Sequence, residues 1–193
     1  TPKPSSAASD VYKRQDQTLV FWECRDGRWH RRDVCLVGER IESVAFVDAH
    51  TFYTAGSRGA LRLWDVSGKC VADVEAVANV EPDEEDELAG LTDALWCAAA
   101  HTIVTVSATQ DFAYFALDGR ALRRTRQLVG YNDEIVDLAV VHSTQLAVAS
   151  NNSLVRIYRL DSADHDVALV AGHTDMVLSL SLIHISEPTR RYA

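Results

Sequence analysis

The chain has 193 residues, of which 47% are hydrophobic, with 19 Lys and Arg against 28 Asp and Glu, as expected of a folded globular protein. A net charge of −9 argues against direct wrapping of a long phosphate backbone, and no apolar run approaches the about 20 residues of a membrane-spanning helix. The four cysteines, Cys24, Cys35, Cys70 and Cys97, lack the paired spacing of a zinc site, and we expect them to be buried free thiols.

The two ends of the chain differ from the part between them. Residues Ser5 to Gln15 read SSAASDVYKRQ, and Leu180 to Arg190 read LSLIHISEPTR. Both strings resemble translations of the two adapters of a transposon-based sequencing library. We therefore predict that residues 1–15 and 180–193 are adapter-derived and that residues 16–179 are an internal fragment of native sequence. This fragment holds 14 Lys and Arg against 26 Asp and Glu, a net charge of −12, which favours protein partners.

The first half of the fragment contains short runs rich in β-branched and aromatic residues, separated by turn residues. LVFWEC, at residues 19–24, predicts a strand that ends near Trp22. After Gly38, strands are expected around 41–46, at 51–56, at 61–66 with Trp64 and Asp65, and at 70–77. These lengths and separations favour an all-β fold.

An acidic stretch, NVEPDEEDELAG, interrupts the pattern between residues 79 and 90. Its charge and its proline predict a solvated surface loop at residues 81–87, and a docking site for a basic partner is the alternative.

Strands resume in the second half of the fragment. They are expected at 101–108, at 112–117 with Phe115, and at 121–129, where Arg123, Arg124 and Arg126 are expected to face solvent on an outer strand. After Gly130 and Tyr131, further strands are expected from 135, at 145–150, at 155–160 with Tyr158, and at 166–171. Another first strand is expected at 176–178, after Gly172 and His173.

The aromatic residues that end the third strands recur at regular intervals. Trp22, Trp64, Phe115 and Tyr158 are separated by 42, 51 and 43 residues, and the acidic stretch accounts for the longer interval. Four short strands in each period of about 40 to 45 residues are typical of a WD40 β-propeller blade. We therefore predict a partial propeller of about four four-stranded blades in residues 16–179, with a lone antiparallel sandwich as the structural alternative.

WD40 blades usually contain a hydrogen-bonded set that joins a Gly-His histidine, a strand Ser or Thr, a turn aspartate and the tryptophan. Of the residues in this chain, His173 is placed for the histidine role and Asp111 for the turn aspartate. We predict a structural role for His173 in preference to a metal or catalytic one. The predicted structural markers of the repeat are Trp22, Gly38, Trp64, Asp65, Asp111, Phe115, Gly130, Tyr131, Tyr158, Gly172 and His173.

The segments RQLVGYNDEIVDLAVV, LAVASNNSLVRIYRLD and LVAGHTDMVLSL carry a more specific resemblance. Together with VTVSATQDFAYFAL, they resemble the transducin-β-like WD40 subunit of the UTP-B subcomplex of the small-subunit processome, from about Thr102 to Leu178. The chain departs from that family in its acidic insertion and in lacking the family's remaining blades and its C-terminal helical domain.

The resemblance implies a nucleolar, non-catalytic scaffold in small-subunit processome assembly and 18S pre-rRNA processing. Its partners would be other processome proteins, with pre-rRNA and U3 small nucleolar RNA reached mainly through the complex. No nucleophile elbow, phosphate loop or dinucleotide motif is present, and we expect no catalytic residue, cofactor, metal, membrane contact or small-molecule substrate. The alternatives are a generic WD40 protein-interaction adaptor in another complex, and an enzyme whose site lies outside this sequence.

Overall fold

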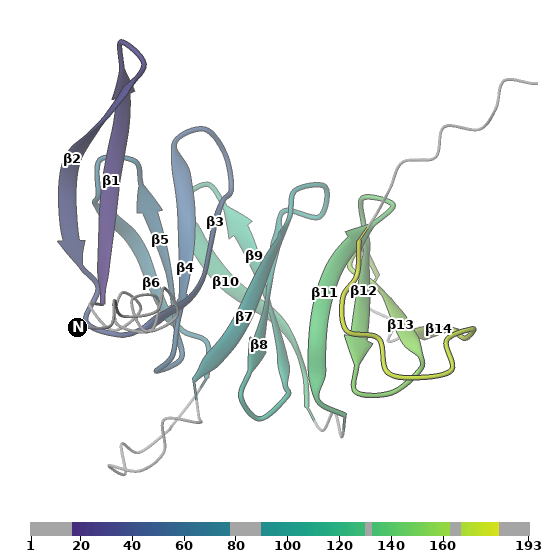
Figure 1. Cartoon of the computed structure of the whole chain (residues 1–193). Coiled ribbons are helices and arrows are strands. Elements are labelled where there is room, and N and C mark those ends of the chain that lie inside the picture. Colours follow the sequence, from purple (N-terminus) through teal and green to yellow (C-terminus); the bar gives the residue numbers. More distant parts are fainter. Residues whose placement is uncertain (1–16, 78–89, 130–132, 163–166, 182–193) are drawn as a thin grey trace, which may run out of the picture. The chain divides into compact units, whose positions relative to one another are not determined.

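The computed structural model describes residues 17–77, 90–129, 133–162 and 167–181, and every regular element in these ranges is a β-strand (Figure 1). They form two compact units, divided between Asn132 and Asp133. The prediction of an all-β fold built from WD40-type blades is confirmed. None of the described segments forms a helix that could cross a membrane.

The first unit contains a hairpin and two four-stranded antiparallel sheets, each with its strands in chain order. The hairpin pairs β1 (Thr18–Arg25) with β2 (Arg28–Leu36). The first blade consists of β3 (Ile41–Phe46), β4 (Thr51–Gly56), β5 (Ala60–Asp65) and β6 (Cys70–Glu75). The second blade consists of β7 (Leu91–Cys97), β8 (Thr102–Ser107), β9 (Phe112–Asp118) and β10 (Ala121–Leu128).

The second unit contains a third blade of the same order. Its strands are β11 (Ile135–Val141), β12 (Gln145–Ser150), β13 (Val155–Arg159) and β14 (Val167–Val170). The described residues therefore hold three four-stranded blades. The β1–β2 hairpin corresponds to the third and fourth strands of an additional blade.

The strand predicted at residues 176–178 is wrong, because residues 171–181 form no strand. This segment is instead tied to the third blade. The amide of Val177 donates to the Asn152 carbonyl at 3.3 Å, and the amide of Leu180 donates to an oxygen of Asp137 at 2.6 Å. These two backbone amides, which could have paired with a neighbouring strand, thus donate to a loop carbonyl and a side chain instead.

Irregularities in strand pairing recur at the same positions of the blades. Between the first and second strands, the register shifts just after Ile41, Leu91 and Ile135. Between the third and fourth strands, the fourth strand has one extra residue beside the aromatic position, at Trp22 and Trp64, and opposite Phe115. Since a bulge is a local feature of the backbone, this recurrence supports one repeated unit.

The core of the first unit lies between its two blades. Leu61 and Leu63 of β5 are fully buried and belong to one cluster with Leu91 and Ile103 of the second blade. All six residues of β8 are buried, which explains its continuous run of β-branched residues. A second link is polar, because Tyr53 Oη and Ser43 Oγ both donate to the Ala94 carbonyl, at 2.7 and 3.0 Å.

The expectation of four buried thiols is wrong in part. All four cysteines are free, but only Cys97 is buried, while Cys24 and Cys70 are exposed and Cys35 is half-buried. Cys70 begins the outermost strand of the first blade, where a side chain has a neighbour on one side only. The predictions for residues 1–15, for the acidic run 81–87, for Gly130 and Tyr131, and for residues 182–193 concern parts outside the described residues.

Candidate functional site

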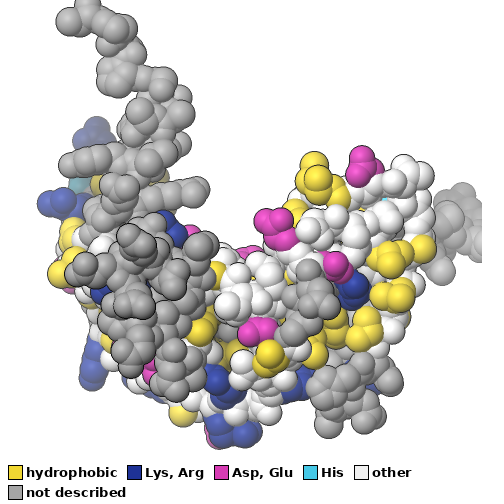
Figure 2. Space-filling view, turned by 90° about the horizontal axis from the view of Figure 1, so that it is seen from below, with side chains coloured by type: hydrophobic (Ala, Val, Ile, Leu, Met, Phe, Trp, Pro, Cys, Tyr) yellow, Lys and Arg dark blue, Asp and Glu magenta, His cyan; other side chains and the backbone are white. Residues whose placement is uncertain are grey.

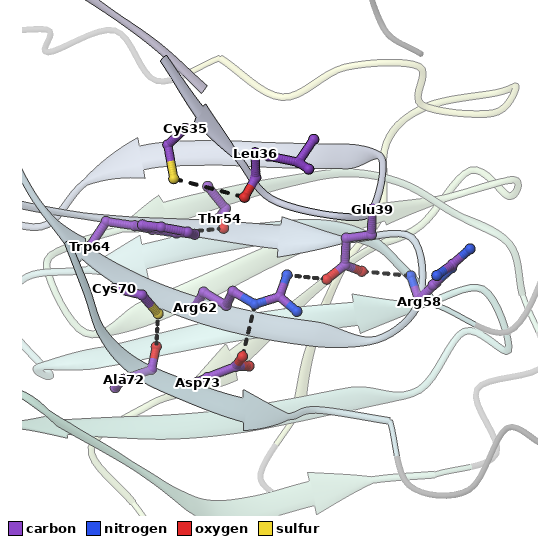
Figure 3. Close-up of polar contacts among 10 residues, drawn as sticks. All are labelled: Cys35, Leu36, Glu39, Thr54, Arg58, Arg62, Trp64, Cys70, Ala72 and Asp73. Atoms are coloured by element: carbon purple, nitrogen blue, oxygen red, sulfur yellow. Dashed lines mark hydrogen bonds and ion pairs between the residues drawn. The ribbon is translucent and has the colours of Figure 1, made fainter. Parts of the chain in front are cut away.

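The best-defined polar site lies at the end of the first blade, around the turn that joins the second strand to the third (Figure 3). We call this connection the BC turn; it comprises residues 57–59, 108–111 and 151–154 in the three blades. The side chain of Glu39 is only 3% exposed. One of its oxygens accepts the amide of Arg58 at 2.9 Å, and the other accepts an N–H of the Arg62 guanidinium. Arg62 also donates to Asp73 at 2.9 Å.

Arg62 neutralises a carboxylate that would otherwise be buried without a counter-charge. Burial opposes the charge of the guanidinium, but the hydrogen bonds and charges of Asp73 and Glu39 outweigh this effect and raise the pKa of Arg62. Removal of one partner from a buried ion pair typically costs about 3 to 5 kcal/mol, because the other charge is left unpaired. The pair therefore holds the BC turn through the Arg58 amide.

The neighbouring polar contact in this blade joins Trp64 to Thr54. The indole Nε1 donates to Thr54 Oγ1 at 2.9 Å, and both residues are buried. This is the tryptophan-to-strand-threonine part of the hydrogen-bonded set that WD40 blades usually contain. Glu39 follows Gly38 directly and stands where such a blade has its histidine.

The second blade fixes its BC turn with hydroxyl groups. Ser107 Oγ lies 2.7 Å from Thr109 Oγ1, and Thr109 donates to the Asp111 carboxylate at 3.1 Å. The amide of Asp111 donates back to Ser107 Oγ at 3.0 Å. Asp111 therefore lies in the BC turn, and its carboxylate orders that turn locally.

The third blade repeats the arrangement of the first blade. Asp133 forms an ion pair with Arg156 at 2.8 Å and accepts the side-chain amide of Asn152, in the BC turn, at 2.7 Å. Arg156 also donates to Ser150 Oγ at 3.3 Å. An acid before the first strand thus contacts both the BC turn and an arginine of the third strand in two blades.

The aromatic markers occupy matching places in their sheets. Trp64, Phe115 and Tyr158 lie on β5, β9 and β13 and pair with Phe52, Ile103 and Leu146 of the preceding strands. All three markers are buried. Trp22 lies on β1 at the position that the recurring bulge defines, but it is 58% exposed, because in the described residues β1 pairs with β2 alone.

Asp65 and Gly38 shape local turns. The Asp65 carboxylate accepts the Ser67 hydroxyl and the amides of Ser67 and Lys69, at 2.9 and 3.1 Å for the two amides. The hydrogen bond from the Ser67 side chain, followed by the two amides, lowers the pKa of Asp65. Gly38 has a φ of 83°, in the left-handed region where glycine is favoured, just before the buried Glu39.

Among the described residues, His173 belongs to no hydrogen-bonded set. Gly172 and His173 lie in the strand-free segment 171–181, and the imidazole is exposed. Because this segment does not continue as a first strand, its histidine is not carried to the end of a sheet.

The three arginines of β10, Arg123, Arg124 and Arg126, were all predicted to face solvent, and only one of them is exposed. Arg123 is exposed, as predicted, but the guanidinium of Arg124 lies 5.5 Å from the centre of the Phe115 ring and donates to the carbonyls of Glu75 and Ala76 at 2.8 and 2.5 Å. Arg126 lies 4.1 Å from the centre of the Tyr114 ring. Arg124 therefore links the two blades of the first unit.

Sequence reasoning missed the acid–arginine pairs, Glu39 with Arg62 and Asp133 with Arg156. The signal was available, because each acid lies two residues before the first strand and 23 residues before its arginine. Within the described ranges, no three His, Cys, Asp or Glu side chains are grouped so as to hold a metal ion. Figure 2 shows basic, acidic and hydrophobic side chains on one face of the described residues.

The recurring four-stranded sheets define a WD40 repeat protein with β-propeller blades. No model of a protein family matches the chain. It is similar to transducin beta-like protein 3 of Bos taurus, with 33% identity over 184 residues that cover 87% of this chain, and to that of Homo sapiens, with 32% identity over 135 residues that cover 68% of it.

The aligned part is a small share of these relatives. The chain spans 21% of the length of the bovine protein and 15% of the length of the human protein. The match therefore concerns a few blades.

Proposed function

We propose that the protein is a non-catalytic scaffold of the UTP-B subcomplex, that it acts in small-subunit processome assembly and 18S pre-rRNA processing, and that it is located in the nucleolus. The observation that carries this proposal is the similarity to transducin beta-like protein 3 over 87% of the chain. The sequence resemblance from about Thr102 to Leu178 supports it.

The structure offers a physical basis for a scaffold. Its blades are antiparallel sheets with buried centres, and their turns are held by side-chain contacts such as Glu39–Arg62 and Ser107–Thr109. A rigid frame that presents turns is a common design for binding proteins. A turn that is held by such contacts before a partner binds loses little conformational entropy on binding.

The charge of the chain indicates which contacts are expected. A net charge of −9 over the whole sequence disfavours a long groove for bare RNA. We propose that the partners are other processome proteins, and that pre-rRNA and U3 small nucleolar RNA are reached mainly through them. RNA alone should bind weakly, with an affinity that falls steeply as salt is added.

Depletion of the protein in its source cells tests the proposal. We expect 18S rRNA to fall while large-subunit rRNA is maintained, and a tagged copy to localise to the nucleolus. Re-expression of the protein should restore 18S rRNA. Normal 18S rRNA after complete depletion, together with a cytoplasmic or vesicular location, would instead favour a WD40 adaptor of another complex.

A further inference from the structure

The acid–arginine pairs of the first and third blades occupy the same register positions. Glu39 and Asp133 each lie two residues before the first strand, which starts at Ile41 or Ile135. Arg62 and Arg156 each lie two residues before the aromatic of the third strand, and they pair with Thr54 and Val148 of the second strand. The two pairs are therefore equivalent, although they belong to different compact units.

The residue that ends the second strand differs between the two blades, and the difference matches the length of the acid. Gly56 ends β4 and pairs with Ile41, while Ser150 ends β12 and pairs with Ile135. A Cβ at Gly56 would lie 2.0 Å from an oxygen of the Glu39 carboxylate and 2.1 Å from its carbon, far closer than atoms can approach. The carboxylate of Glu39 thus occupies the space of a side chain at residue 56.

In the third blade that space is filled by the serine. Asp133 is one methylene shorter than Glu39, and Ser150 Oγ accepts a hydrogen bond from Arg156 at 3.3 Å. The BC turn is also contacted differently. Glu39 accepts the backbone amide of Arg58, whereas Asp133 accepts the side-chain amide of Asn152, the equivalent turn residue.

We propose that each of these blades carries a matched positioning set, Glu39–Gly56–Arg58–Arg62 in the first blade and Asp133–Ser150–Asn152–Arg156 in the third, which fixes the conformation of the BC turn. The length of the acid and the size of the residue that ends the second strand are coupled within each set. Only the use of these turns as partner contacts rests on the proposed scaffold function.

Transfer of the third-blade set into the first blade tests the coupling in the full chain. Gly56→Ser alone should raise the unfolding equilibrium constant at least about tenfold, because its side chain meets a buried carboxylate that can move away only by giving up its hydrogen bonds from Arg58 and Arg62. The triple variant Glu39→Asp, Gly56→Ser, Arg58→Asn should recover to within about threefold of the wild type. Coupled residues give non-additive changes in the free energy of unfolding. The proposal would be overturned if the change in the triple variant equalled the sum of the changes in the three single variants.

Hydrogen exchange separates a positioning role from general stability. With Arg62→Met, the Arg58 amide should exchange at least about tenfold faster, while the Gln110 amide, bonded to the Ser107 carbonyl in the second blade, keeps its rate. Arg40→Met, which removes a more exposed arginine paired with Glu42, is the matched control and should leave the Arg58 amide unchanged. An unchanged rate at Arg58 in Arg62→Met would overturn the proposal. Neither readout involves a partner, so they can fail while the scaffold role stands.

Discussion

Trp64 and Thr54 are joined by a hydrogen bond of 2.9 Å between the indole Nε1 and the threonine Oγ1, inside the first blade. In the second blade the corresponding residues are Phe115 and Thr105, and Thr105 Oγ1 donates instead to the Ala113 carbonyl at 3.3 Å. A threonine at this position can therefore form a hydrogen bond through its hydroxyl group even where the blade has no tryptophan.

This comparison gives the first prediction. Trp64→Phe should lower the free energy of unfolding by about 1 to 2 kcal/mol, since Thr54 Oγ1 loses the indole N–H that it accepts and some packing is lost, while the Thr54 hydroxyl remains able to donate to a backbone carbonyl as Thr105 does. Trp64→Ala should cost about 3 to 5 kcal/mol, because it also leaves a cavity. Urea unfolding of both variants measures the difference. Equal losses for the two variants would show that the hydrogen bond, and not packing, dominates.

Tyr53 gives a prediction about alkaline pH. Desolvation of this buried phenol raises its pKa to about 12, while its hydroxyl donates to the Ala94 carbonyl. The raised pKa means that the folded state favours the neutral form, so its contribution is complete below pH 10 and is lost as the pH rises toward 12. That loss should amount to about 2 to 3 kcal/mol.

Measurement of unfolding between pH 9 and 12 in wild type and Tyr53→Phe checks this prediction. The variant is expected to be less stable at pH 8 by about 1 kcal/mol, because its hydrogen bond is missing, and to lose less stability above pH 10. Parallel pH profiles for the two proteins would count against a role for the Tyr53 hydroxyl. Tyr114, whose pKa burial also raises, remains in both proteins.

Arg124 and Arg123 are adjacent on β10 but make different contacts. Arg124 donates to the carbonyls of Glu75 and Ala76 of the first blade and lies against Phe115. Arg124→Met should therefore cost about 1.5 to 3 kcal/mol, the usual value of hydrogen bonds to a charged group. Arg123→Met, on the exposed side of the same strand, should change stability by less than about 0.5 kcal/mol. Thermal unfolding of both variants is the test, and a similar loss in each would contradict the inter-blade link.

Much of the fold could be predicted because strand patterns are local. The runs at residues 51–56, 61–66 and 145–150 coincide with β4, β5 and β12 to within a residue, since β-branched residues and turn signals act over a few neighbours. The failure at 176–178 shows the limit of this reasoning. An apolar run becomes a strand only where another strand pairs with it, and pairing is not encoded in the run itself.

The polar site was less predictable for a related reason. From the sequence we expected a histidine set that includes His173, whereas the first and third blades use Glu39 and Asp133 with arginines. The role of Glu39 depends on the missing side chain at Gly56, which is 17 residues away and meets it only once β3 and β4 pair. Similarly, Arg124 belongs to a basic run whose sequence does not reveal the carbonyls of the neighbouring blade.

Gly90 supplies the last prediction, at a residue that sequence reasoning did not single out. It lies just before β7, and its carbonyl accepts the amide of Ala108 at 2.9 Å. A Cβ at this position would lie 1.6 Å from the Ser57 carbonyl oxygen and 2.0 Å from its carbon, so two backbone segments of different blades would have to separate. Backbone cannot rotate away as a flexible side chain can. Gly90→Ala should therefore cost at least about 3 kcal/mol.

The matched control is Gly119→Ala. No atom lies within 4 Å of a Cβ at Gly119, so only its left-handed φ of 60° opposes the substitution, at a cost of about 1 to 2 kcal/mol. Urea unfolding of the two variants should show the larger loss for Gly90→Ala, together with faster hydrogen exchange at the Arg58 amide, which adjoins the displaced carbonyl of Ser57. A smaller loss at Gly90 than at Gly119 would mean that the first and second blades do not approach so closely at the Ser57 turn.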